Sequence, residues 1–599
     1  MIFRPASAKF RCPALPLDNS PTALSGVAMR FAVPRGRAPR ILAAALAALA
    51  ACGEPRRPAP AGESAGPAYG GTLVIAGAND LETLNPLAAS EKWGQEFIRF
   101  ALFLPLIRYG PRLEYEPALA ESWELLGDTG VVFRLRRDVR WHDGRPVTAE
   151  DVAFTFERAK DPRTAFPNAH YFAAWRAAEV LDSFTIRFRF DPHPDPLAGW
   201  PFTPPVPRHL LAAVPPERMR MAEFGRRPVG NGPFRFVSVR PNDRWVFEAN
   251  PDFPTALGGR PYVDRVVWRV VPENAAQVAE LLTGNVDVIV APGADRLRTL
   301  DADPEIRAVV RPSRTYLFIG WNGRRPPFHD ARVRRALTMA IDRARLVARG
   351  RAGYGEVAAG PISPHHWAYD PSITPLPYDT AAAARLLEEA GFRDRDGDGV
   401  REDARGRKLE FRMKIAAENA FQRDLAELIR ADLAAVGVRL RPEPTEFTTL
   451  VAQISSPARD FDAVLMGWES DFRINLTPLF HSSARNGPYQ LASYSNPEVD
   501  RLLDLAERTT DRAAAAPLWR RIQLLLRDDQ PWTFLYHSPE LFAVRERVRG
   551  VHMDIRGALV ELPRWWLVPA SAAAASPGAR PAPPARRVQP ATATAGRTK

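Results

Sequence analysis

Amphipathic helices and short apolar strands alternate along most of this chain, and this alternation constrains its fold more than any other feature. The apolar run at 72–76, TLVIA, predicts a strand, and a helix predicted at Asn274–Leu282 precedes another strand at 286–290. Further along, the pattern predicts one long helix over 331–347 and a buried strand at 461–467, FDAVLMG. Repeated helix–strand units favour α/β domains with largely parallel sheets. Ligands of such sheets bind beyond the carboxyl ends of the strands.

A helix-start signal lies in the first third of the chain. Thr148 is followed three positions later by Asp151, which is the spacing of a capping box, and a helix is predicted over 149–159. The preceding WHDG at 141–144 contains Asp-Gly, a strong turn former, and predicts a turn with a packed indole.

Length and charge limit the remaining possibilities. A chain of 599 residues is too long for a single core, so two or three domains are expected. The net charge of +12 is concentrated at the ends: residues 1–51 contribute +6 and residues 570–599 contribute +5, which leaves +1 between them. A nearly neutral body lacks the basic surface that phosphate binding requires, so no nucleic-acid partner is expected. Residues 570–599, rich in Ala, Pro and Arg, are expected to be disordered.

The N-terminal region has the order of a secretory signal: arginines, then the apolar run Ile41–Ala51, then small residues. The run is too short to span a bilayer and ends in LAAC at Cys52, which resembles the bacterial lipobox. We therefore expect a lipoprotein signal peptide at 1–51, with Met29 as the true start, lipidation of Cys52, and a flexible tether at 52–69. Two or three acyl chains would anchor the protein stably on the periplasmic or extracytoplasmic side of a membrane. A plain signal peptide with an incidental cysteine is the alternative.

Several longer motifs carry a family resemblance. The most specific are ALAESWE at 118–124 and FRLRRDVRWHDGRPVTAEDVAFTFERA at 133–159. The others, in order, are GNGPF at 230–234, PPFHDARVRRALTMAIDR at 326–343, EEAGFRDRDGDGV at 388–400 and YSNPEVD at 494–500. Over about residues 70–569 the chain resembles the family 5 extracytoplasmic solute-binding proteins, the oligopeptide and dipeptide receptors of ABC transporters.

The resemblance implies an α/β periplasmic-binding-protein fold with two lobes, a two-strand hinge and an extra subdomain in the first lobe. Lobe I is expected at 70–311 and 536–569, including the inserted subdomain at about 111–225, and lobe II at 312–535. Family members close on a peptide between the lobes and deliver it to the permease subunits of an importer. The resemblance thus implies a monomeric receptor that has no cofactor and catalyses no reaction.

The resemblance also indicates a ligand site directly after the strand at 461–467. Peptide-binding members have Trp-x-x-Asp here, and their Asp pairs with the ligand's α-ammonium group. Trp468, Glu469, Ser470 and Asp471 occupy this place, with Asp471 at the position of the anchor. A carboxylate on a surface loop is the alternative interpretation.

One departure from the family pattern concerns the ligand's carboxylate. Dipeptide-specific members carry an arginine for it upstream of the next amphipathic helix, and that position is Ala416 in this chain. The following loop offers Asn419, Gln422 and Arg423 as polar alternatives, and of these we predict that Asn419 contacts the ligand. A dedicated dipeptide receptor is not expected.

An acidic loop is a weak candidate for a metal site. Asp394, Asp396 and Asp398 match the start of a calcium-binding loop, D-x-D-x-D-G. The twelfth position of the loop is Arg405, where such loops need a bidentate Glu, so a tight turn without a metal is favoured.

Other functions remain open at this point. A receptor of the same fold could bind a nickel chelate, a sugar or an opine, or the chain could be a signalling or adhesion lipoprotein. A bilobal hydrolase is a more distant alternative, because no Ser/His/Asp, metal-binding or Walker motif occurs in a suitable context.

Overall fold

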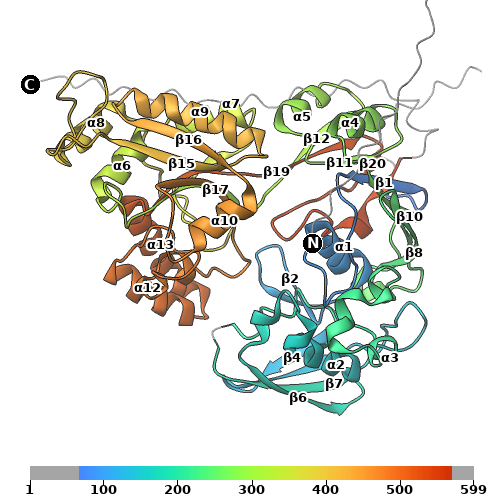
Figure 1. Ribbon diagram of the computed structural model, residues 1–599. Helices are drawn as coiled ribbons and strands as arrows, with labels where there is room; N and C mark the ends of the chain where they lie inside the picture. Colours follow the sequence, from blue (N-terminus) through green and yellow to red (C-terminus); the bar gives the residue numbers. More distant parts are fainter. Residues whose placement is uncertain (1–65, 194, 569–599) are drawn as a thin grey trace, which may run out of the picture. The chain divides into compact units, whose positions relative to one another are not determined.

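Two large mixed β-sheets organise the chain, as a computed structural model of residues 66–193 and 195–568 shows (Figure 1). These described residues all belong to one compact unit. The predicted signal peptide, Cys52, most of the tether and the predicted tail at 570–599 lie outside them. Among the helices within the described ranges, none has both the length and the apolar character to cross a bilayer.

The first sheet has seven strands in the order β12-β19-β11-β1-β10-β9-β8. Their bounds are β1 (Thr72–Gly77), β8 (Phe234–Arg240), β9 (Arg244–Ala249), β10 (Arg265–Val270), β11 (Val288–Val290), β12 (Ile306–Arg311) and β19 (Glu540–Arg545). One face packs against helix α1 (Lys92–Phe97) and the π-helical turn Ile98–Leu102 that follows it, and the other packs against α4 (Asn274–Leu282) and α5 (Ala294–Leu300). The predicted helix at 274–282 is thus confirmed.

The second sheet has six strands in the order β14-β18-β13-β17-β15-β16. Their bounds are β13 (Thr315–Trp321), β14 (Glu356–Val357), β15 (Glu410–Ala416), β16 (Arg439–Thr445), β17 (Ala463–Glu469) and β18 (Trp532–His537). Only β15 in this sheet and only β1 in the first sheet pair in parallel with both of their neighbours. The prediction of largely parallel sheets is therefore wrong, because the β8–β9 hairpin and the returning strands β18 and β19 add antiparallel pairs.

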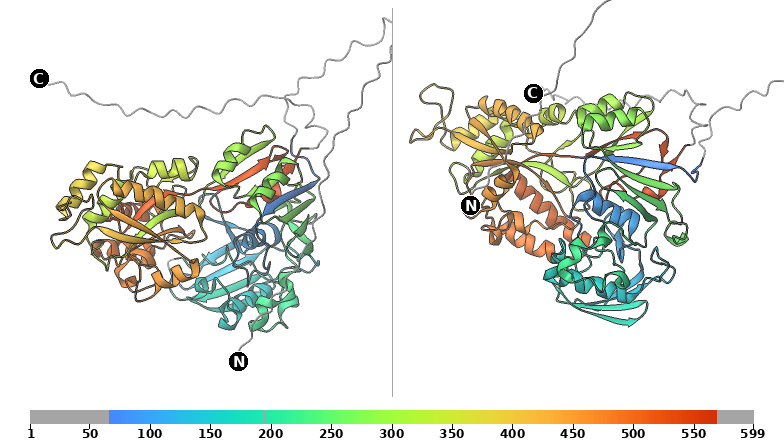
Figure 2. Two further views of the ribbon diagram at one scale, coloured as in Figure 1. Left: turned by 45° about the horizontal axis from the view of Figure 1, so that its top comes forward. Right: turned by 45° about the vertical axis from the view of Figure 1, so that its right-hand side comes forward.

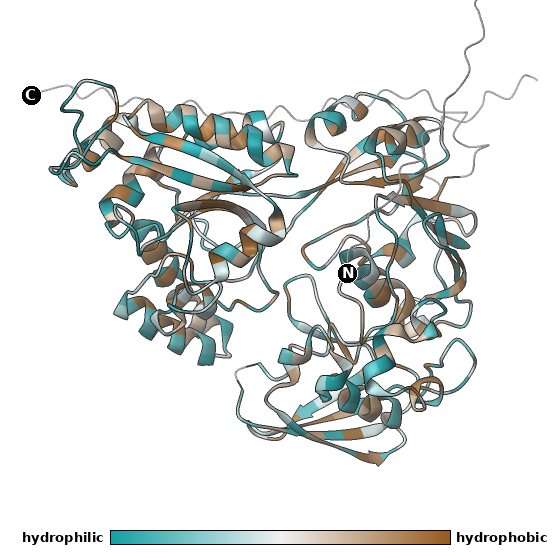
Figure 3. Ribbon diagram, viewed as in Figure 1, coloured by the Kyte–Doolittle hydropathy of each residue, from teal (hydrophilic) through white to brown (hydrophobic). Residues whose placement is uncertain are grey.

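Strand β13 shows how the second sheet is buried on both faces. Successive side chains of a strand point to opposite faces, so Leu317, Ile319 and Trp321 belong to one apolar core, while Tyr316 and Phe318 belong to another. The first core also contains α6 (Ala331–Ala340), α7 (Arg343–Gly350), α8 (Thr380–Glu389) and α9 (Ala420–Ala434); the second contains α10 (Phe447–Ser455), α11 (Thr477–Phe480), α12 (Pro497–Arg508) and α13 (Arg512–Asp529). Figure 3 shows the apolar β17 between these layers, and α9 with polar and apolar residues intermixed.

A separate four-stranded antiparallel sheet, in the order β4-β5-β7-β6, lies within the range predicted for the inserted subdomain. It comprises β4 (Ala120–Leu125), β5 (Gly130–Leu135), β6 (Trp175–Asp182) and β7 (Thr185–Phe190), and α2 (Ala149–Lys160) packs on it. The predicted capping box of Thr148 and Asp151 is present at the start of α2, and the predicted indole of Trp141 is buried. The remaining short elements are β2 (Ile107–Tyr109), β3 (Tyr115–Pro117), α3 (Arg208–Leu211), β20 (Val548–Arg549) and β21 (Trp566–Leu567).

The chain passes between the two large sheets twice, at 312–314 between β12 and β13 and at 538–539 between β18 and β19. Strand β19 consequently lies among strands that precede it by more than 200 residues, β11 and β12, as the views of Figures 1 and 2 agree. The two crossings fall close to the predicted lobe limits, which themselves stay a prediction.

The single helix predicted over 331–347 is wrong, since it is two helices, α6 and α7, with a break at Ile341–Asp342. Asp342 caps α7 by accepting the backbone N–H of Arg345 at 2.9 Å, and its own N–H donates to Asp432 at 3.0 Å. Ile341 remains fully buried in the break, so the apolar pattern runs on although the helix does not.

Candidate ligand-binding site

Two adjoining cavities, of about 300 and about 390 Å³, meet at the segment that follows β17. Both are lined by Arg314, Glu469 and Asp471. The smaller one is polar, and its walls come from the first crossing, from helix α1 with the turn after it, and from the segment after β20; they include Lys92, Glu96, Arg99, Arg311 and Arg556. The larger one is mostly apolar and includes Ile362, His366, Trp468, Leu476, Leu479 and Tyr489.

Asp471 carries a charge that no neighbouring residue pairs. Its side chain opens into both cavities, and within residues 66–193 and 195–568 it has no hydrogen bond or ion pair. Burial by the surrounding protein raises the pKa of this carboxyl, although Arg314 and His170 lower it in part. Asp471 is nevertheless solvent-exposed, so water solvates its carboxylate. A carboxylate that lines two cavities without a protein partner is suited to receive a cation from a ligand.

Glu469, in contrast, is already neutralised. Arg314 donates from Nη2 to Glu469 Oε1 at 2.7 Å and from Nη1 to the carbonyl of Ser470, and its guanidinium stacks on Phe472 at 3.9 Å from the ring centroid. Arg314 therefore holds the backbone and the acidic side chain of this segment in place. No sequence motif marks Arg314, and its position just before β13 is the only signal of its role.

The other predicted residues fall in two places. Trp468 lies edge-on to Tyr489 at 5.5 Å in the apolar cavity, and the Ser470 hydroxyl donates to the carbonyl of Pro361 at 3.4 Å. Asn419 lines neither cavity. Its side chain instead caps α9 by accepting the N–H of Gln422 at 3.1 Å. The structure thus brings 468–471 together and leaves Asn419 in a structural role.

Phe472, directly after Asp471, joins the two halves of the site. It is 5 % exposed and packs with Leu113 and Ile555. Its ring stacks on Tyr109 at 5.1 Å and 11°, and it contacts Phe202 at 5.1 Å. These partners belong to the part of the chain predicted as lobe I, whereas Phe472 belongs to the part predicted as lobe II.

A partly buried ion network supports the wall of the polar cavity. Glu540 pairs with Arg311, whose Nη2 lies 2.6 Å from Oε1, and with Lys92. Burial alone would raise the pKa of Glu540, but Arg311 and Lys92 together lower it to about 2. This network joins α1, the end of β12 and the start of β19, and it was not predicted from the sequence.

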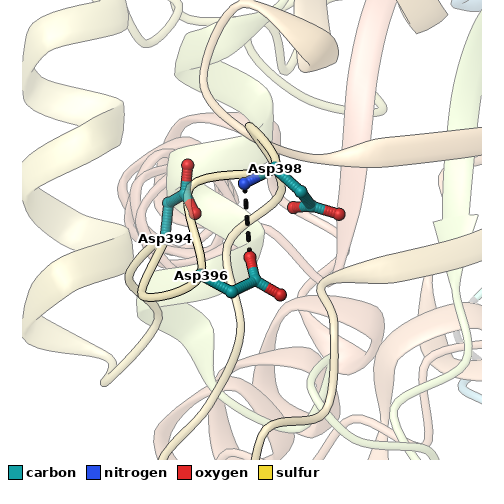
Figure 4. A group of neighbouring side chains, drawn as sticks. All are labelled: Asp394, Asp396 and Asp398. Atoms are coloured by element: carbon teal, nitrogen blue, oxygen red, sulfur yellow. Dashed lines mark hydrogen bonds between the residues drawn. The ribbon is translucent and has the colours of Figure 1, made fainter.

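The acidic loop has its own counter-charge. Asp394, Asp396 and Asp398 are exposed, and their oxygen atoms lie within 4.8 Å of one another (Figure 4). The Lys408 ammonium pairs with Asp396 at 2.5 Å and with Asp398 at 2.8 Å. Asp394 accepts the backbone N–H groups of Gly397 and Gly399, at 2.8 and 3.0 Å. Each carboxylate therefore stabilises the loop itself, and we assign no ion to it.

Comparison with known proteins agrees with this geometry. Residues 114–490 match the family described as "Bacterial extracellular solute-binding proteins, family 5 Middle", and the chain belongs to this family of binding proteins. It is 30 % identical over 512 residues to the oligopeptide-binding protein AppA of Bacillus subtilis, covering 84 % of this chain and 93 % of that protein. The structure of AppA from Bacillus subtilis in complex with a nonapeptide has a TM-score of 0.68 at 29 % identity, over 84 % of this chain and 100 % of that chain. The heme-binding protein A of Haemophilus influenzae is 29 % identical over 467 residues, covering 73 % of this chain and 81 % of that protein.

Proposed function

We propose that this protein captures peptides between its two lobes and delivers them to the permease of an ABC importer, without catalysing a reaction. The observation that carries this proposal is the unpaired carboxylate of Asp471 at the junction of a polar and an apolar cavity. The likeness to an oligopeptide-binding protein and to its nonapeptide complex supports the same conclusion.

The chemistry of the site suits a receptor for varied peptides. Different peptides share their backbone amides, their α-ammonium group and their carboxylate, so a broad receptor must bind these groups. Asp471 is placed to pair with the ammonium, since an unpaired charge in a closed site is costly. The apolar cavity beside it, with Trp468 and Tyr489, offers room for the first side chain.

Mass spectrometry of the ligand released from purified protein tests this function. We expect peptides with free amino termini. Release of a haem, a nickel chelate or a sugar, together with no measurable binding of peptides in titration calorimetry, would assign the site to another solute and overturn the proposal.

Membrane attachment through Cys52 belongs to the same proposal and is supported by the lipobox-like LAAC. Labelling with a radioactive fatty acid should mark the wild type and spare Cys52→Ala. Equal labelling of the two proteins would remove the anchor from the proposal and leave peptide capture unaffected.

A further inference from the structure

Arg99 is the cation of the polar cavity with the fewest protein partners. It lies in the π-helical turn after α1, and its side chain is only 12 % exposed. Its Nε atom is buried without a hydrogen-bond partner, and its side chain donates no hydrogen bond to any residue in the described part of the chain. Among the described residues its one ion pair is with Glu96, with 3.9 Å between Arg99 Nη2 and Glu96 Oε1.

The other arginines beside it are satisfied. Arg311 binds Glu540 and also donates from Nη1 to the carbonyl of Asp554 at 2.8 Å. Arg314 binds Glu469 and the Ser470 carbonyl. Glu96 is itself engaged, because its Oε2 accepts the backbone N–H of Leu559 at 3.0 Å. Arg99 therefore keeps its donors free in a cavity that it shares with three other guanidinium groups. The third of these belongs to Arg556, which pairs with Asp554 at 2.6 Å.

Aromatic rings fix the position of this guanidinium. It lies 4.8 Å from the ring centroid of Phe100 and 5.2 Å from that of Phe202. Stacking of this kind holds the planar fork of an arginine in place while its N–H groups remain available. A fork held in this way matches a carboxylate, which accepts two parallel hydrogen bonds from it.

Two opposite charges whose side chains make no hydrogen bond within the described residues thus line one cavity: the Arg99 guanidinium, which has only the long ion pair with Glu96, and the Asp471 carboxylate. We propose that Arg99 binds the terminal carboxylate of a short peptide whose ammonium group is bound by Asp471. This inference rests on the proposed function and narrows it to short peptides with both termini free. The cavity volume of about 300 Å³ is at the lower end of the range of roughly 300–1,000 Å³ typical of small-ligand sites, so a ligand that bridges both charges inside it is short.

Titration calorimetry on the full-length protein with three synthetic peptides tests the inference. The peptides are Leu-Gly-Gly, its C-terminal amide and its N-acetyl derivative. For the wild type we expect the amide to bind about 10- to 100-fold more weakly than the free acid, which is the range for losing hydrogen bonds to a charged group. This comparison uses the unmodified protein and does not depend on the folding of any variant.

Substitutions then locate the effect. Arg99→Met keeps the apolar stem and should lose affinity for the free acid by the same factor, so that acid and amide bind alike. Arg99→Lys keeps the charge but not the planar fork, so its affinity for the free acid should lie between those of the wild type and Arg99→Met. Arg108→Met is the matched control, because Arg108 is a half-exposed arginine of β2 that pairs with Glu116 and does not line the cavity. It should bind all three peptides as the wild type does.

The outcomes separate this inference from the proposed function. Equal affinities of acid and amide for the wild type, with a weaker N-acetyl peptide, would overturn the role of Arg99 and leave peptide capture standing. The role of Arg99 would also be overturned if Arg99→Met kept the wild-type ratio of affinities for the free acid and the amide. If none of the three peptides binds the wild type, both the inference and the peptide-binding function proposed above fail.

Discussion

Asp471 is the residue whose charge the site leaves without a partner, and its substitution is the sharpest test of the anchoring role. Asp471→Asn keeps the shape and removes the charge, so affinity for a peptide with a free amino terminus should fall by about 1.5–3 kcal/mol, the usual worth of a hydrogen bond to a charged group. The lower end applies if water enters the open cavity, because screening weakens the pair. Titration calorimetry with Leu-Gly-Gly measures the change.

Two controls accompany the Asp471 substitution. The N-acetyl peptide should bind the wild type weakly and respond little to Asp471→Asn. Because desolvation raises the pKa of Asp471 above the ordinary value of an aspartate, peptide affinity of the wild type should also decline as the pH falls towards that raised pKa. A pH-independent affinity, or equal affinities of the free and acetylated peptides, would contradict an ammonium anchor at this residue.

Glu540 links stability to pH through its network with Arg311 and Lys92. Its folded-state pKa of about 2 lies below the value of a free glutamate, so the ionised form stabilises the fold above roughly pH 4.3 and the contribution is lost as the pH falls towards 2. Glu540→Gln should lower the free energy of unfolding at pH 7 by at most about 3 kcal/mol, judged from about 1.36 kcal/mol per pKa unit. Urea unfolding at pH 7 and pH 3 should show the difference from wild type narrowing at the lower pH; a constant difference would argue against the ion network.

At the scale of elements, the Asp151 side chain accepts more hydrogen bonds than its sequence motif predicts. The capping-box spacing predicted its bond to Thr148, which is present at 2.9 Å. The structure adds two partners from elsewhere: the buried indole N–H of Trp141 at 3.2 Å and the backbone N–H of Arg208 at 2.9 Å. Local spacing indicated the cap, whereas the other two bonds depend on how the segments pack.

Asp151→Ala should therefore cost more than a lost helix cap. It removes the cap, worth about 1 kcal/mol, and leaves two donors without an acceptor, at about 1–3 kcal/mol for each buried group. We expect a loss of at least about 3 kcal/mol by chemical denaturation. Asp379→Ala is the matched control, because Asp379 caps α8 through one bond to the Ala382 N–H at 2.8 Å and should cost only about 1 kcal/mol. If the two variants lost similar free energies of unfolding, the additional hydrogen bonds of Asp151 would contribute no stability.

The same distinction between local and non-local information explains what could be predicted about the elements. Helices such as Asn274–Leu282 follow from their own periodicity and from Gly284 just beyond them. The break at Ile341–Asp342 could not be predicted, because Ile341 keeps the apolar period of the helix. Whether Asp342 continues one helix or caps a second one is decided by packing, which the local sequence does not show. Strand direction also depends on partners distant in sequence, such as β19 beside β11 and β12, and so the antiparallel pairs were missed.

For the whole molecule, the site could be predicted only in part. The segment 468–471 was found because it lies in one stretch of sequence at the end of a strand, β17, whose last two residues are Trp468 and Glu469. The cavity around it needs Arg99, Arg311 and Arg314, which come from different elements and carry no common motif. Asn419 was chosen from its neighbourhood in the sequence, yet helix capping uses its side chain. Residues that converge only after folding leave no pattern in a single sequence.

Phe472 connects the ligand segment to the opposite wall, so its removal should change the arrangement of the whole molecule. Its ring fills the space between Tyr109, Phe202 and the Arg314 guanidinium. A hydrogen bond also joins the two predicted lobes, because Arg512 donates to the carbonyl of Arg112 at 2.7 Å. Aromatic pairs contribute about 0.5–1.5 kcal/mol beyond their buried area, and a two-state opening needs only a few kcal/mol to shift its populations.

Phe472→Ala should therefore favour an open state in the absence of ligand. Small-angle scattering should show a larger radius of gyration than for the ligand-free wild type, and Leu-Gly-Gly should reduce it again because the peptide is expected to contact both walls. Peptide affinity should fall at the same time, since part of the binding energy is then used to close the molecule. Phe447→Ala is the control, because Phe447 on α10 is 49 % exposed and lines neither cavity. If Phe472→Ala and wild type have the same radius of gyration with and without peptide, Phe472 packs in the core without governing closure, and the contacts through Tyr109 and Phe202 do not set the balance between open and closed states.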